Sequence, residues 1–235
     1  MNEHQSYFTG LTRFSILTTF AMVLAIITAG AREVPVAAVQ RVIGIVEIPP
    51  IFGIPNPQGP PGSRLPSVLT PVSLYHRPKA GSGTVATVNT RDEIATAEYT
   101  YEEPGALVYR QEGGWYLIGL HGPSETAKAW LRPADAGRFH SLSELLKRGS
   151  SYFTSAWDNK LWSEPASGQA TLVDTAAKDI NVLSTRKIGD QTWLQVEVLL
   201  PGRCEGPEPR TVARGWAPAF SPEGKMNAWF YARGC

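Results

Sequence analysis

The motif Leu74-Tyr75-His76-Arg77-Pro78 in the first half of the chain recurs as Leu161-Trp162-Ser163-Glu164-Pro165 in the second half. Two further motifs recur after it in the same order. Gly114-Trp115-Tyr116-Leu117-Ile118 corresponds to Thr192-Trp193-Leu194-Gln195-Val196, and Ala129-Trp130-Leu131 corresponds to Gly215-Trp216-Ala217. The spacing between the motifs differs between the two halves, as insertions in surface loops allow. A weak repeat of this length predicts two copies of one fold.

Short apolar runs separated by turn residues predict that both copies are all-β. The runs 72–75, 84–89 and 94–101 each end at a Pro, an Arg-Asp or a Pro-Gly turn. Alternation is clearest from 97 to 102, with Ala97, Tyr99 and Tyr101 on one face and Glu98, Thr100 and Glu102 on the other. This is the period of a strand that buries one face. Short strands at this spacing are typical of a barrel or a sandwich.

The three repeated motifs resemble those of tandem bacterial SH3-like (SH3b) domains. The opening strand carries an aromatic residue and a Pro, the central strand carries a Trp, and the closing strand carries a Trp before a Pro turn. Two features depart from the family pattern: Ala129 stands where a Gly usually precedes the closing Trp, and an extra strand, 227–232, ends the second copy. The resemblance implies an all-β fold of two small SH3-like barrels, at 72–137 and 155–235. It also implies a binding or adaptor role outside the cytoplasm.

A short helix is expected between the two copies, within a connector at 138–154. Ser141 and Glu144 have the spacing of a capping box, in which each side chain bonds the backbone of the other. Leu142, Leu145 and Leu146 form one apolar stripe, and Gly149 follows as a stop signal. The helix is therefore expected to pack against one of the copies.

The segment 32–71 is expected to hold one strand followed by a Pro-rich linker. The β-branched run 42–48 predicts the strand. Eight prolines lie between positions 48 and 71. Proline lacks a backbone donor and has a fixed φ, so this stretch is expected to be an extended spacer outside any central sheet. A polyproline tract that docks a partner is the alternative.

The N-terminus, 1–31, has the pattern of a signal peptide. Residues 14–31 are uncharged, follow Arg13, and end with Ala29 and Ala31 in the small-x-small order that signal peptidase requires. Cleavage is expected after Ala31, which would make the protein periplasmic or secreted. The alternative is an uncleaved inner-membrane anchor formed by 14–31, and only in that case is a membrane a partner.

Cys204 and Cys235 are the only two cysteines. In an exported protein they are most simply explained as one structural disulfide at the C-terminal end of the second copy. On the chain-entropy model such a bond would stabilise the fold by about 3 to 4 kcal/mol. Two independent thiols are the alternative.

Charge and motif content argue against nucleic-acid binding and against catalysis. With 22 basic and 21 acidic side chains, the net charge of +1 provides no field to attract a nucleic acid. His76, His121 and His140 lack metal-ligand spacing, so no metal or cofactor is expected. No nucleophile elbow or phosphate-binding loop is present. The adjacent acids Asp92-Glu93 and Glu102-Glu103 are expected to be solvated rather than a glycosidase dyad, so no catalytic residue is assigned.

The aromatic residues are the candidates for recognition. Trp115 and Trp193, in the central strands, are expected to fill the two cores. The remaining ring residues could line a shallow groove for a peptide or a glycan; these candidates are Tyr75, Tyr99, Tyr101, Tyr116, Trp130, Trp162 and Trp216. The sequence therefore predicts an exported, non-enzymatic adaptor that binds a cell-wall peptide or an envelope protein. A structural partner that docks through its Pro-rich segment is the second hypothesis, and a wall hydrolase is the third.

Overall fold

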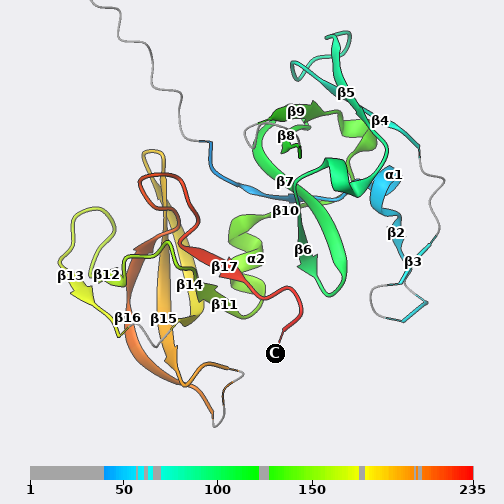
Figure 1. The fold of residues 1–235 in the computed structure, drawn as a ribbon. Coiled ribbons are helices and arrows are strands. Elements are labelled where there is room, and N and C mark those ends of the chain that lie inside the picture. Colours follow the sequence, from blue (N-terminus) through cyan, green and yellow to red (C-terminus); the bar gives the residue numbers. More distant parts are fainter. Residues whose placement is uncertain are drawn as a thin grey trace, which may run out of the picture. The chain divides into compact units, whose positions relative to one another are not determined.

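The fold is mostly β, as the alternating apolar pattern predicts, and is built on two antiparallel sheets (Figure 1). The computed structural model describes residues 40–56, 58–60, 63–65, 70–121, 127–174, 178–203, 205 and 208–234. All of these residues fall within one compact unit.

The first sheet has eight strands. They are β1 (Gly44–Val46), β4 (Val72–Tyr75), β5 (Thr84–Val88), β6 (Thr96–Thr100), β7 (Glu103–Glu112), β8 (Trp115–Gly119), β9 (Lys128–Leu131) and β10 (Phe139–Ser141). Seven of them pair in the order β10-β1-β7-β8-β9-β4-β5, and β6 pairs with β7. The long strand β7 pairs with β1, β6 and β8, because its ten residues extend past each of these neighbours.

The second sheet has seven strands. They are β11 (Ser151–Phe153), β12 (Lys160–Trp162), β13 (Ala170–Leu172), β14 (Asp179–Ile188), β15 (Gln191–Leu200), β16 (Arg210–Pro218) and β17 (Ala228–Phe230). Their order is β13-β12-β16-β15-β14-β11-β17, and Figure 1 shows the last strand, β17, in red beside β11.

The two sheets have the same strand order. Each sheet is compared starting from the strand that comes last in the chain. The first sheet then runs β10-β1-β7-β8-β9-β4-β5, and the second runs β17-β11-β14-β15-β16-β12-β13. The chain visits corresponding strands in the same sequence in both copies, and β6 has no counterpart among the described strands of the second sheet. The sequence repeat therefore corresponds to a repeat of topology.

The register of the strands repeats as well. Trp130 faces Tyr75 on one neighbouring strand and Leu117 on the other, while Trp216 faces Trp162 and Gln195 in the same way. The hairpin β7–β8 has a bulge between Val108 and Arg110, and the hairpin β14–β15 has one at the corresponding place, between Val182 and Ser184. A bulge locally redirects a strand and increases its twist. Its recurrence shows that the two copies share their local bending and not only their strand order.

Each copy is longer than the ranges 72–137 and 155–235. The first sheet also contains β1 and β10, and the second begins at β11. These additional strands have three residues each. The run 42–48 predicted β1 as a strand but not as part of the first copy, and β10 and β11 fell within the expected connector, because three residues show little alternation.

The first part of the Pro-rich segment is a core element rather than an extended linker. Pro49 and Pro50 open the short helix α1 (Pro49–Phe52), where the missing backbone donors of proline cost nothing. Ile48, Ile51 and Phe52 are buried with the apolar side chains of the first sheet. Further along, β2 (Ile54–Pro55) and β3 (Arg64–Leu65) form a separate two-stranded sheet.

The predicted helix is present as α2 (Leu142–Arg148), between the two copies (Figure 1). Oγ of Ser141 accepts a hydrogen bond from the backbone N–H of Glu144 at 3.1 Å, which is one half of the expected capping box. The Glu144 carboxylate instead accepts from Arg138 Nη2, at 3.0 Å. All three leucines of the predicted stripe are buried.

The described residues form two apolar cores, one for each of the two large sheets. The first contains only residues of the first copy, from Val46 to Leu131. The second contains the three leucines of α2 and the inner face of the second sheet, together with Ile45 and Tyr99 from the first copy. The second core therefore extends across the boundary between the copies.

Several sequence predictions fall on residues outside the described ranges. They are the signal peptide or anchor at 1–31, its cleavage residues Ala29 and Ala31, and the cysteines Cys204 and Cys235. Among the residues that are described, no helix has the length and apolar character needed to cross a membrane.

Candidate binding groove and buried histidine network

The aromatic residues of the repeated motifs form one pair in each copy. The rings of Tyr75 and Trp115 meet edge to face, with centroids 5.4 Å apart and an interplanar angle of 87°. The rings of Trp162 and Trp193 do the same at 6.1 Å and 89°. Edge-to-face contact places the positive rim of one ring on the negative face of the other, and contributes about 0.5 to 1.5 kcal/mol beyond burial. The repeat thus preserves a specific contact.

The closing tryptophans, Trp130 and Trp216, are core residues. They are 7% and 6% exposed, so they offer little surface to a ligand. A guanidinium lies near each ring, that of Arg110 at 5.8 Å from the Trp130 centroid and that of Arg186 at 5.0 Å from the Trp216 centroid. These cation–π contacts shield the tryptophans further.

The other aromatic candidates do not join these pairs. Tyr99 is buried, at 4% exposure, in the core of the second copy. Tyr116 is half-buried and stacks on Phe139 at 5.4 Å. Tyr101 is exposed and lies 5.5 Å from the guanidinium of Arg233. The seven candidates are therefore spread over both copies and do not form one surface.

The expected core residues behave differently in the two copies. Trp193 is buried, at 8% exposure. Trp115 is only half-buried and lies at the start of β8. In each pair, the ring from the opening strand, Tyr75 or Trp162, is half-buried and keeps part of its surface exposed.

A groove of about 540 Å³ lies beside Trp162 in the second copy. Its walls come from β12, β13 and β16, together with residues just beyond β13 and at the end of β15. Leu172 is 74% exposed and Val212 is 43% exposed, which are high values for aliphatic side chains. Asp174 and Arg214 also line the groove, so it presents both signs of charge beside an apolar surface.

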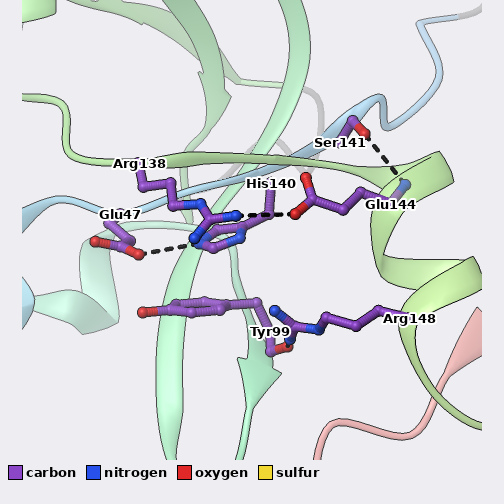
Figure 2. A network of polar contacts seen from close by, with 7 residues as sticks. All are labelled: Glu47, Tyr99, Arg138, His140, Ser141, Glu144 and Arg148. Atoms are coloured by element: carbon purple, nitrogen blue, oxygen red, sulfur yellow. Dashed lines mark hydrogen bonds and ion pairs between the residues drawn. The ribbon is translucent and has the colours of Figure 1, made fainter.

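A buried histidine, His140, lies in the first copy, where no sequence motif marks it as part of a site. Nε2 of His140 is 2.9 Å from Oε1 of Glu47. The carboxylate oxygen accepts, so Nε2 carries the donated proton. Figure 2 shows the Tyr99 ring lying face to face with the imidazole, and the two centroids are 4.3 Å apart at 19°. The His140 side chain is 3% exposed.

Tyr99 connects this network to the rest of the molecule. Its hydroxyl donates to Oε2 of Glu103 at 2.6 Å. Its backbone oxygen accepts from Arg148 of α2 at 2.7 Å (Figure 2). Burial raises the pKa of Tyr99 far above its usual value, and the hydrogen bond to Glu103 and the nearby charge of Glu47 act in the same direction. Tyr99 therefore stays neutral and acts as a hydrogen-bond donor.

The network is suited to holding elements together rather than to catalysis. A base–carboxylate pair of this kind can orient a general base, but a base must reach its substrate. The second ring nitrogen of His140, Nδ1, is buried and has no hydrogen-bond partner among the described residues. With one face of its ring covered by Tyr99, His140 gives a substrate no clear access. Glu47 lies 93 positions away, so no local motif could have revealed the pair.

Of the adjacent acidic residues, Glu93 and Glu103 accept hydrogen bonds within the fold, and Asp92 and Glu102 are exposed. Glu93 accepts hydrogen bonds from the backbone of Asn89 and Thr90, which lower its pKa and close a short 3₁₀ turn. Glu102 has a φ of 55° in an exposed turn, and Glu103 accepts from Tyr99. Within the described ranges, no cluster of three His, Cys, Asp or Glu side chains could hold a metal ion.

The fold and the groove define the molecule as a duplicated all-β protein in which aromatic pairs recur in both copies. Comparison with known proteins adds no family: no protein-family model matches the chain, and no curated protein matches it.

Proposed function

We propose that this chain is an exported, non-enzymatic adaptor whose SH3-like modules contact a cell-wall peptide or a peptide segment of an envelope protein. The observation that carries the proposal is the groove beside Trp162, where a half-buried aromatic ring adjoins exposed Leu172 and Val212. Aromatic and aliphatic walls with a few polar groups are typical of sites that bind peptides and small ligands.

An extended peptide fits this groove because β13 is an edge strand of the second sheet. All three residues of β13 are exposed, and among the described strands β12 is its only neighbour in the sheet. Edge strands recruit extended peptides through backbone hydrogen bonds, while side-chain pockets select the sequence. Leu172 and Trp162 would contact alternate apolar side chains. Arg214, whose Nη2 is paired with Oε1 of Glu197 at 2.7 Å, would lie beside the backbone of the bound peptide.

The place of action in this proposal is the periplasm or the outside of the cell. It rests on the uncharged run 14–31 and on the small residues at its end, which favour export. An inner-membrane anchor formed by 14–31, with the rest of the chain in the periplasm, is compatible with the same binding role.

The proposal is tested by titrating the protein with purified muropeptides while following tryptophan fluorescence. Trp162→Ala should weaken binding by at least about 30-fold, since a central aromatic contact contributes about 2 kcal/mol or more. Tyr75→Ala, at the corresponding position of the first copy and outside the groove beside Trp162, is the matched control and should leave binding to that groove unchanged. Absence of a fluorescence change at millimolar muropeptide would exclude direct binding to the wall, and equal losses in both variants would exclude a site at Trp162.

A second candidate function is supported by the β2–β3 hairpin. Ile54 and Leu65 are 57% and 46% exposed, and with Pro49 and Pro50 they line a groove of about 310 Å³. An apolar hairpin in the Pro-rich segment is the surface expected of a structural partner that docks through this segment.

Docking through the hairpin is tested by purification from the native envelope. The double variant Ile54→Asp/Leu65→Asp should lose its co-purifying proteins, because charge disrupts an apolar contact. Val85→Asp changes a comparably exposed aliphatic residue away from the hairpin and serves as the control. Retention of the same partners by the double variant would exclude this function.

A further inference from the structure

A separate cavity of about 290 Å³ lies where the two copies meet. Its walls are the residues leading into β1, the first turns of α2, and the strands β14 and β15 with the residues after β16. Apolar side chains that are themselves buried make up much of its lining; they are Val42, Leu142, Leu146, Leu194, Ala219 and Phe220. Ligand sites are common at such junctions between structural units.

The rim of this cavity carries a positive charge with an unused hydrogen-bond donor. Nη1 of Arg41 donates to the backbone oxygen of Asp190, and its guanidinium carbon lies 5.6 Å from the centroid of the Phe220 ring. Nε of Arg41 is buried without a hydrogen-bond partner among the described residues. Buried polar groups in proteins are nearly always satisfied, so an unsatisfied guanidinium N–H indicates a missing acceptor.

A second cation lies at the same rim. Lys187 is exposed at the end of β14, and of the charged residues that line the cavity only Asp190 is acidic. The charged residues that line the cavity therefore have a net charge of +1. Ser143 and Thr185 are already bonded to each other through their hydroxyls at 2.9 Å, so they close one wall. The cavity thus combines an apolar floor with a cationic rim.

We propose that this cavity binds a small amphipathic monoanion, an apolar chain that ends in one carboxylate. The chain would lie on Leu142, Leu146 and Leu194, and the carboxylate would accept from Arg41 Nε beside the ammonium of Lys187. Such an oxygen acceptor would satisfy Arg41 Nε, which has no hydrogen-bond partner within the part of the chain that the structure describes. This goes beyond the proposed adaptor function, because the cavity shares no lining residue with the groove beside Trp162.

The proposal is tested by calorimetric titration of the full chain with octanoate, with 1-octanol as the uncharged probe of the same length. Octanoate should bind at least about tenfold more tightly than 1-octanol, since a charge-assisted contact is stronger than a neutral one. Lys187→Glu should weaken octanoate binding by about tenfold and leave 1-octanol unchanged. Lys178→Glu removes another exposed lysine, away from the cavity, and should match the wild type.

Three results would overturn the proposal. They are equal affinities for octanoate and 1-octanol, equal effects of Lys187→Glu and Lys178→Glu, and absence of octanoate binding at millimolar concentration. Lys187 is exposed, so its replacement leaves the core intact, and an unchanged thermal midpoint confirms that the variant is folded. Muropeptide binding is measured on the same variants, and its loss together with octanoate binding would show a general defect instead.

Discussion

Replacing Glu47 with Ala should destabilise the protein by leaving His140 buried without a partner. In the wild type, Nε2 of His140 donates to Glu47 over 2.9 Å, and the His140 side chain is 3% exposed. Water cannot readily replace the lost acceptor, because the His140 side chain is almost completely buried. Removing one partner of a buried hydrogen bond costs about 1 to 3 kcal/mol, whereas removing both partners together costs much less. The expected loss of unfolding free energy for Glu47→Ala is therefore about 2 kcal/mol.

The assay is urea denaturation followed by tryptophan fluorescence, with the change in midpoint converted through the measured slope. Glu47→Gln keeps an acceptor at the same position and should recover most of the loss. Arg138→Ala is the control, because it breaks an exposed ion pair with Glu144, and such pairs contribute about 0 to 1 kcal/mol. The double variant Glu47→Ala/His140→Phe should be more stable than Glu47→Ala alone. If Glu47→Ala costs no more than Arg138→Ala, the network is not a stabilising element.

Three further predictions follow from the packing and the ionisable groups. Gly105→Ala should lower the unfolding free energy by about 1 to 3 kcal/mol, because the added Cβ would lie 2.5 Å from Ile45 Cγ2. Gly149→Ala is the control: its added Cβ meets nothing within 4 Å, so the denaturation midpoint should be unchanged. Burial, together with the hydrogen bond to Asp179, raises the pKa of Tyr231 to about 12. Since this pKa is above that of a tyrosine in the unfolded chain, the stability that the hydrogen bond contributes is complete below about pH 10 and is lost as the pH rises toward the pKa of Tyr231 in the folded protein. Spectrophotometric titration that finds every tyrosine ionising near pH 10 would contradict this. Reduction of the predicted disulfide should cost about 3 to 4 kcal/mol in urea denaturation, and a thiol assay that finds two reactive thiols in the untreated protein would remove the basis for this expectation.

The aromatic residues show how far the sequence could predict the site. The motif repeat correctly identified which residues correspond between the copies, since Tyr75–Trp115 and Trp162–Trp193 form the same edge-to-face contact. The repeat could not show which rings remain accessible. Trp130 and Trp216 are buried by the strands that cross beside them and by a guanidinium on each ring, and such contacts depend on neighbouring strands rather than on local order.

The Pro-rich segment shows the limit of reasoning from composition. Proline excludes a residue from the interior of a sheet, but it is favourable in the first turn of a helix. Pro49 and Pro50 occupy that position in α1 and allow Ile51 and Phe52 to enter the first core. The composition of the segment does not distinguish an extended spacer from the start of a helix. Which of the two forms depends on whether an apolar surface lies nearby for the segment to pack against.

The sequence by itself determined the β character of the chain, the existence of two corresponding copies, and the helix that begins after Ser141. Each of these depends on periodicity or on residues a few positions apart, which act through local backbone geometry. Only the tertiary structure decided that Glu47 meets His140, that Tyr99 enters the core of the second copy, and that Arg41 and Lys187 border one cavity. These pairings are set by strand register and by the packing of one copy on the other, and neither leaves a local pattern in the sequence.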